Sequence, residues 1–214
     1  MARSRKNVVF EGLAGPIDAV IDWPDGTPKG WALVLHPHSL QGGTRDNKVV
    51  TTIARASVHD GLVAVRPNFR GVGQSAGTFD HADGETADML ELIRQFAAEY
   101  PEAAGGRWLL GGFSFGTAVA ARVYQTLAEQ QAVLPDALIL AGAAVSRFSE
   151  SDIPLPSHTI LVHGEDDDVV PLDETMILAR KADLPVVVVP NAGHFFHGKL
   201  TVLKDIVEQR LKTM

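Results

Sequence analysis

Gly112-Phe113-Ser114-Phe115-Gly116 places a serine between two glycines, directly after the apolar run Trp108-Leu109-Leu110. This spacing is typical of a nucleophile elbow, a sharp turn from a strand into a helix. The serine backbone is strained in such a turn, and the residues two positions before and after it must be small to avoid clashes. The turn leaves the hydroxyl exposed. Because so short a pattern also occurs in ordinary glycine-rich turns, its interpretation depends on the rest of the chain.

Length and charge limit the function classes that remain. The chain has 214 residues, of which 45% are hydrophobic, and this predicts a single domain spanning residues 1–214 with a substantial core. The net charge of -7 repels nucleic acid phosphates and anionic membranes, so we expect neither as a partner. The only basic cluster is Arg3, Arg5 and Lys6, which we interpret as a solvated tail.

The chain contains no cysteine, which excludes a disulfide framework, a thiolate nucleophile and a cysteine metal site. We find no apolar stretch that fits a signal peptide or a membrane span. We therefore expect an enzyme located in the cytoplasm.

Short apolar runs alternate with helix-like segments after residue 30. Runs of this kind suit strands that are buried on both faces. Two earlier strand-like pieces flank Gly12, Gly15 and Pro16, which mark a hairpin. The pattern predicts an α/β fold: a mostly parallel sheet, an antiparallel N-terminal hairpin and helices on both faces. The expected strands are Val8–Glu11, Ile17–Asp22, Trp31–Leu35, Leu62–Val65, Trp108–Leu110, Ala137–Leu140, Thr159–Val162 and Pro185–Val189, and the expected helices are Asn47–His59, Gly84–Tyr100, Phe115–Gln130, Leu172–Ala182 and Gly198–Lys212.

Ligand sites in such sheets lie beyond the carboxyl ends of the strands. The loops found there contain a serine, several carboxylates and histidines. Together they supply what a serine nucleophile needs: a base, a carboxylate that orients the base, and donors for the developing oxyanion. The order along the chain is Ser114, then the acid, then His194.

With these motifs the chain resembles the α/β-hydrolase superfamily, specifically its small lidless members, over nearly its whole length. The order of nucleophile, acid and histidine is the one that this superfamily uses. The resemblance implies an α/β-hydrolase fold without a substantial lid and a Ser-His-Asp triad. It is carried by four segments, His36-Pro37-His38, Asn68-Phe69-Arg70-Gly71-Val72-Gly73-Gln74-Ser75, Gly112-Phe113-Ser114-Phe115-Gly116 and Gly164 to Pro171.

Three adjacent carboxylates compete for the acid role. The family pattern G-x-x-D-x-x-V-P, laid on the segment from Gly164 to Pro171, selects Asp167, with Asp166 and Asp168 as alternatives. The preceding strand is followed by no carboxylate until Glu150, which favours the later position.

His194 is the expected base. His197 is the alternative, although we place it in or near the last helix, where it is less able to reach the elbow. His36 and His38 form an H-x-H pair without a matching cluster, so we predict no metal site and no cofactor.

The resemblance assigns the oxyanion hole to two backbone N–H groups, those of Phe115 and His38. Related chains carry a proline at position 39, which has no N–H to donate. Ser39 stands there in this chain, so its N–H remains a second candidate.

Two further segments are interpreted more simply. Gly71-Val72-Gly73 is not a dinucleotide fingerprint, because the next glycine, Gly77, lies one residue too far, and Arg70 is interpreted as part of a structural salt bridge. Lids are commonly inserted after the strand that precedes the acid, and only residues 146–157 are available for one here. We therefore expect an open, shallow site shaped by Leu40, Phe113, Phe115, Phe195 and Phe196, unless these are core residues, which applies most to Phe113.

The sequence predicts acyl transfer to Ser114, followed by hydrolysis of the acyl-enzyme. Carboxylic esters of small or medium acyl groups are the first substrate class, and thioesters the second. Alternatives are a non-catalytic small-molecule-binding protein on the same scaffold and a peptidase-type serine hydrolase, with an oxidoreductase third. The expected partner is a small-molecule acyl substrate, and the oligomeric state stays open.

Overall fold

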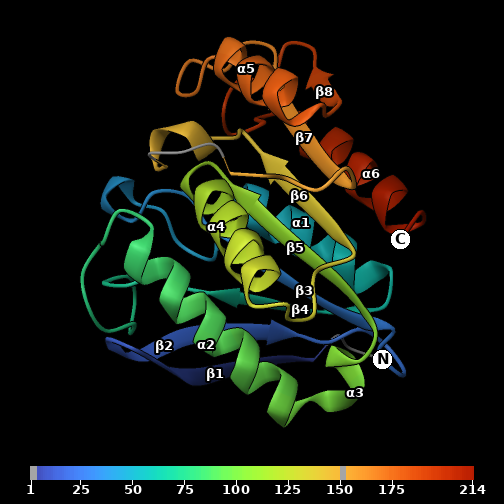
Figure 1. The fold of residues 1–214 in the computed structure, drawn as a ribbon. Coiled ribbons are helices and arrows are strands. Elements are labelled where there is room, and N and C mark those ends of the chain that lie inside the picture. The colour runs from blue at the N-terminus through green and yellow to red at the C-terminus, as the bar shows by residue number, and fades with distance from the viewer. Residues whose placement is uncertain (1–3, 150–152) are drawn as a thin grey trace.

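The computed structural model describes residues 4–149 and 153–214, and its centre is one eight-stranded sheet (Figure 1). Arg3 and Glu150, which entered the sequence predictions, lie outside the described residues. The elements in chain order are β1 (Arg5–Gly12), β2 (Gly15–Asp22), β3 (Gly30–Leu35), the 3-10 helix η1 (Ser39–Gln41), α1 (Lys48–His59), β4 (Leu62–Pro67), α2 (Asp83–Glu99), α3 (Pro101–Ala104), β5 (Arg107–Phe113), α4 (Phe115–Glu129), β6 (Ala137–Ala141), the 3-10 helix η2 (Val145–Arg147), β7 (Thr159–Gly164), α5 (Leu172–Ala182), β8 (Val186–Val189) and α6 (Leu200–Leu211).

The strands lie in the order β1-β2-β4-β3-β5-β6-β7-β8. From β4 to β8 all neighbours are parallel, whereas β2 is antiparallel to both β1 and β4. The hairpin register pairs Gly12 with Gly15, so β1 and β2 are joined by a two-residue turn. The predicted mostly parallel sheet with an antiparallel N-terminal hairpin is confirmed.

Helices cover both faces of the sheet, and each face has its own hydrophobic core. One core packs beneath α2, α4 and α5, and the other beneath α1 and α6. Figure 1 shows α2 and α4 lying together over the sheet. In the first core Trp31 stacks between Phe96 and Trp108, with ring centroids 4.4 and 4.9 Å apart. Burial of this kind contributes about 25 cal/mol for each Å² of apolar surface, which makes the two cores the main source of stability.

Helix boundaries follow local chemistry. Helix α1 begins after Asn47, whose side chain accepts a hydrogen bond from the N–H of Val49 at 2.8 Å. Helix α6 begins at Leu200 and not at the predicted Gly198, because Gly198 has a φ of 72° that no right-handed helix contains. The short helix α3 was not predicted; its first residue is Pro101, a favoured first helical position.

The segment between β6 and β7 is short, as the sequence predicts. In its described residues, 142–149 and 153–158, the only helical piece is η2. Arg147 attaches η2 to α5 through two hydrogen bonds to Glu174, at 2.8 and 2.6 Å. The carboxyl edge of the sheet around β5 is therefore covered by loops. Among the described residues, the helices are too short or too polar to pass through a bilayer.

Candidate active site

The turn from β5 into α4 forces Ser114 into an unusual conformation. Its φ is 53° and its ψ is -121°, values that are costly for a residue with a side chain. Both flanking glycines are required by close packing: a Cβ on Gly112 would collide with the carbonyl of Gly116, and one on Gly116 would lie 2.5 Å from the carbonyl oxygen of Leu35. The structure thus has the strand-to-helix elbow that the five-residue pattern predicts.

Three of the predicted side chains meet at the carboxyl ends of β5, β7 and β8. Nε2 of His194 lies 3.0 Å from Oγ of Ser114, and Nδ1 of His194 lies 2.7 Å from Oδ2 of Asp167. A carboxylate can only accept, so Nδ1–H donates to Asp167 and Nε2 is left to accept the serine hydroxyl proton. All three residues are buried.

The competing residues lie elsewhere. Asp166 and Asp168, on either side of Asp167, are exposed, and no contact with His194 is found for them among the described residues. His197 is also exposed, and its ring stacks on Phe195 at a centroid distance of 5.9 Å. The hydrogen-bonded set is therefore Ser114, His194 and Asp167.

The surroundings of Asp167 keep its carboxyl group ionised. Burial alone would raise its pKa, but hydrogen bonds from His194 and from the N–H groups of Val170 and Val169 outweigh it and lower the pKa below the ordinary value. The two backbone N–H groups reach Oδ1 at 2.8 and 3.0 Å. Because Oδ1 is occupied in this way, Oδ2 faces His194.

His163, at the end of β7, lies directly behind this carboxylate. Its Nε2–H donates to the carbonyl of Val170 at 2.8 Å, and its Nδ1 accepts from the hydroxyl of Thr175 at 2.8 Å. Nε2 is also 3.3 Å from Oδ2 of Asp167. Burial lowers the pKa of His163, so its ring stays neutral and positions the acid loop. No role was predicted for His163, although it directly precedes the segment from Gly164 to Pro171.

The imidazole of His194 packs against a glycine and an aromatic ring. Gly142 has a φ of 56°, and a Cβ there would lie 3.0 Å from Cε1 and 3.2 Å from Nδ1 of His194. The ring of Phe113, whose Cε2 would lie 3.4 Å from the same Cβ, is 4.8 Å from the imidazole, centroid to centroid. Gly142 was not singled out in the sequence, although its place directly after β6 at the carboxyl edge is the signal that could have identified it.

The two N–H groups predicted as oxyanion donors belong to His38, in the loop after β3, and to Phe115, the first residue of α4. Among the described residues no acceptor is found for the N–H groups of His38 and Phe115. His36 anchors this loop: Nδ1–H donates to the carbonyl of Pro37 at 2.6 Å, and Nε2 accepts from the N–H of Phe69 at 2.9 Å. Burial lowers the pKa of His36 to about 4. Both ring nitrogens of His36 are therefore engaged in protein hydrogen bonds.

Comparison with known proteins places this geometry in a family. Residues 64–203 match the family model described as Serine hydrolase (FSH1). The chain belongs to this family. It is an enzyme of the α/β serine hydrolase type.

Solved structures agree with this placement. A Xanthomonas campestris protein, described as an α/β serine hydrolase without lid, has a TM-score of 0.88 and 32% identity, covering 100% of this chain and 96% of its own. An α/β serine hydrolase homologue from Coxiella burnetii has a TM-score of 0.82 and 30% identity, covering 99% of both chains. The uncharacterized protein RP471 of Rickettsia prowazekii is 29% identical, over 97% of this chain and 89% of its own length.

The predicted pocket residues separate into two groups, one exposed and one buried in the core. Leu40 and Phe195 are 74% and 42% exposed, and Phe195 lines a cavity of about 270 Å³ with His197 and residues of the 42–48 loop. Phe196 is fully buried in the core beneath α1 and α6, so its predicted place in the pocket is wrong. The reason is local: Phe196 has a φ of 52°, and in this turn its side chain points into the core. Phe113 also belongs to that core, as the alternative interpretation held.

An aromatic cluster near the predicted oxyanion loop was not anticipated. The ring of His38 stacks on Phe79 at 4.5 Å, and Phe148 packs edge-on to Phe115 at 4.8 Å. Phe79 and Phe148 come from the long segments after β4 and β6. Their position beyond the carboxyl ends of strands is the signal that could have found them.

Two remaining predictions concern residues outside the hydrogen-bonded set. Arg70 bonds Asp88 through Nε at 2.5 Å and through Nη2 at 3.1 Å, which agrees with a structural salt bridge. Within the described part of the chain, no group of three or more His, Asp or Glu side chains is arranged to hold a metal ion.

Proposed function

We propose that this chain hydrolyses carboxylic esters of small or medium acyl groups through an acyl-enzyme on Ser114. The observation that supports this proposal is the continuous hydrogen-bonded set, in which His194 lies 3.0 Å from the serine hydroxyl and 2.7 Å from Asp167. A serine hydroxyl is a weak nucleophile unless an adjacent base removes its proton. In this set the base is oriented by a carboxylate, which is the arrangement that acyl transfer requires.

In the first half of the reaction, Oγ of Ser114 bonds to the ester carbonyl carbon while its proton passes to Nε2 of His194. The electron pair of the carbonyl moves to its oxygen. We assign the stabilisation of that charge to the N–H groups of Phe115 and His38, with the N–H of Ser39 as the second candidate for the loop donor. Removing one such donor typically costs roughly 3 to 4 kcal/mol of transition-state stabilisation.

The tetrahedral intermediate then collapses to the acyl-enzyme, and the proton on Nε2 goes to the leaving alcohol. Hydrolysis of the acyl-enzyme is the second half of the reaction. Water then attacks the acyl-enzyme, His194 accepts the proton of that water, and the carboxylic acid leaves as Oγ is reprotonated. Asp167 stays ionised throughout and stabilises the imidazolium that forms in each half. The lowered pKa of Asp167 is consistent with this role.

The size of the cavity that Phe195 lines, next to His194 in the chain, supports a small or medium acyl group. The space of about 270 Å³ beside Phe195 lies just below the range of roughly 300 to 1,000 Å³ that drug-sized ligands occupy. Thioesters remain the second substrate class, because their thiolate leaves at least as readily as an alkoxide. Peptide hydrolysis is less favoured, since an amine is a poorer leaving group.

The test combines active-site labelling with an acyl-chain series. A fluorophosphonate should label the wild-type chain covalently and fail to label Ser114→Ala. Rates with p-nitrophenyl acetate, butyrate, octanoate and palmitate, and with matched thioesters, should fall for the longest acyl chain. Labelling that persists in Ser114→Ala contradicts the nucleophile. If no ester or thioester is turned over while a ligand still binds, the chain is the non-catalytic binding protein instead.

A further inference from the structure

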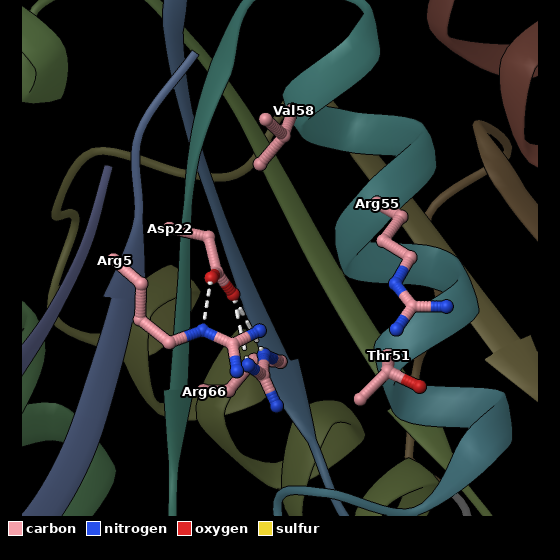
Figure 2. Close-up of a pocket in the computed structure, with 6 residues that line it drawn as sticks. All are labelled: Arg5, Asp22, Thr51, Arg55, Val58 and Arg66. Carbon is pink, nitrogen blue, oxygen red and sulfur yellow. Dashed lines mark hydrogen bonds and ion pairs between the residues drawn. The ribbon is translucent and has the colours of Figure 1, made fainter. Parts of the chain in front are cut away.

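A second cavity, of about 370 Å³, lies on the sheet face that α1 covers, where β4 meets the N-terminal hairpin (Figure 2). None of the catalytic set lines it, and β3 lies between β4, at the cavity, and β5, the strand that precedes Ser114. The residues that line it are Arg5, Asp22, Thr51, Arg55, Val58 and Arg66. Three arginines and one carboxylate line it, and Asp46 pairs with Arg66 from outside the lining, which leaves one positive charge in excess, in a chain whose net charge is -7.

Asp22 fixes two of the three guanidinium groups. Its Oδ1 accepts from Nε of Arg5 at 2.7 Å, and its Oδ2 accepts from Nε and Nη2 of Arg66 at 3.0 and 2.9 Å. The side chain of Arg66 is fully buried, and its Nη1 donates to the carbonyl of Arg45 and to Asp46 at 2.7 and 3.0 Å. Arg66 is therefore held in one geometry before any ligand arrives, and Arg5 is linked to it through Asp22.

Strong donors remain on this preformed cluster. A guanidinium has five N–H groups, and in the described structure Arg5 uses only the one on Nε. For Arg55 no partner is found among the described residues, although it lines the same cavity. Figure 2 shows Arg55 and Thr51 on α1, across the cavity from Asp22 and its two arginines.

These donors match one ligand chemistry. A planar guanidinium presents paired N–H groups that fit phosphate oxygens, and such charge-assisted hydrogen bonds are about twice as strong as neutral ones. Asp22 and Asp46 offset two of the three positive charges, and both oxygens of Asp22 are occupied, so the charge of Arg55 is left for an anionic ligand. A carboxylate ligand has two oxygens, too few for each of the three guanidinium groups to bond one of its own. A tetrahedral phosphate has enough oxygens to bond each of them.

We propose that this cavity binds the phosphate group of a soluble, phosphorylated small molecule. Arg55 supplies paired N–H groups from α1, and Arg5 supplies those of its Nη1 and Nη2 from β1. Arg66, on β4, adds the one N–H of Nη2 that its bonds to Asp22, Arg45 and Asp46 leave over. The volume of the cavity admits a group the size of pyrophosphate with room for a small organic substituent. The site does not depend on the proposed ester hydrolysis.

Isothermal titration of the full chain with pyrophosphate and with inorganic phosphate tests the proposal. We expect one site per chain, with affinity that falls as sodium chloride is raised. Arg55→Met removes the arginine that makes no contact within the protein, so the fold should be kept, and binding should weaken tenfold or more. Arg180→Met is the matched control: Arg180 is an exposed arginine on α5, outside this cavity, and its removal should leave the affinity unchanged.

Four outcomes would overturn the proposal. The first is no binding at millimolar phosphate or pyrophosphate. The second is equal binding by Arg55→Met and Arg180→Met. The third is loss of binding after covalent labelling of Ser114, which would place the anion in the oxyanion hole. The fourth is Arg55-dependent sedimentation with phosphatidic acid vesicles, compared with phosphatidylcholine vesicles, which would make a lipid headgroup the ligand.

Discussion

Replacing Asp167 by asparagine should cost this enzyme nearly all of its turnover while leaving it folded. Oδ1 of Asp167 accepts two backbone N–H groups, at 2.8 and 3.0 Å, whereas Oδ2 faces Nδ1 of His194 at 2.7 Å. The single oxygen of asparagine should stay on the backbone side, because turning the amide would lose two hydrogen bonds worth about 1 kcal/mol each and leave their donors unpaired. The amide NH₂ then faces His194.

This orientation puts the imidazole in the wrong tautomer. Nδ1 must then accept from the amide, so the proton sits on Nε2 and the ring cannot take the proton of Ser114. In serine hydrolases this change lowers kcat about 10⁴-fold, which corresponds to about 5 kcal/mol of activation free energy. Hydrolysis of p-nitrophenyl acetate measures kcat, and thermal unfolding checks the fold.

The neighbouring carboxylates provide matched controls. Asp166 and Asp168 are exposed, so Asp166→Asn and Asp168→Asn should change kcat less than twofold. The reasoning is refuted if Asp167→Asn keeps more than a tenth of the wild-type kcat. It is also refuted if either neighbour shows the larger loss.

Three further predictions concern the support of the site. Gly142→Ala should lower kcat at least tenfold, because its Cβ would lie 3.0 Å from Cε1 of His194; Gly26→Ala, at a similar positive φ with open space around it, should keep the wild-type kcat. Thr117→Ala should lower the free energy of unfolding by about 1 to 3 kcal/mol, since its buried hydroxyl links the nucleophile's carbonyl, at 2.6 Å, to the loop after β6, at 2.9 Å. Urea unfolding measures this, and Thr117→Ser should restore most of the loss. For His36, burial lowers the pKa from 6.5 to about 4, so between these values the unfolded chain binds a proton and the folded chain does not. The free energy of unfolding should therefore fall by about 3 kcal/mol as the pH drops through this window, and His36→Gln should flatten that slope; equal slopes would contradict the prediction.

The sequence was informative wherever structure depends on neighbours along the chain. The two glycines around Ser114 and the cap at Asn47 act within a few residues, and the elbow and the start of α1 were predicted at or within one residue of their places in the structure. Apolar runs predicted the strands because β3 to β6 are buried on both faces. Choosing Asp167 among three aspartates needed the family resemblance, since adjacent residues of one type differ only in where the turn points them.

The features that the sequence did not predict depend on segments that meet only in the folded chain. Gly142 faces His194 because the loops after β6 and β8 converge, although the two residues lie far apart in sequence. The positive φ of Phe196 turns a residue predicted for the pocket into the core. Neither periodicity nor composition specifies such local reversals.

The short strand β8 links activity to a weak part of the fold. It has four residues at the edge of the sheet, three of them not fully buried, and the chain that follows it carries His194. Edge elements with few buried contacts open at lower free energy than the rest of a domain. Opening of β8 alone would withdraw His194 from Ser114 while the other seven strands remain paired. Loss of turnover in denaturant should therefore precede the loss of tryptophan signal from the core, so that activity reports the opening of one strand and fluorescence reports the unfolding of the chain.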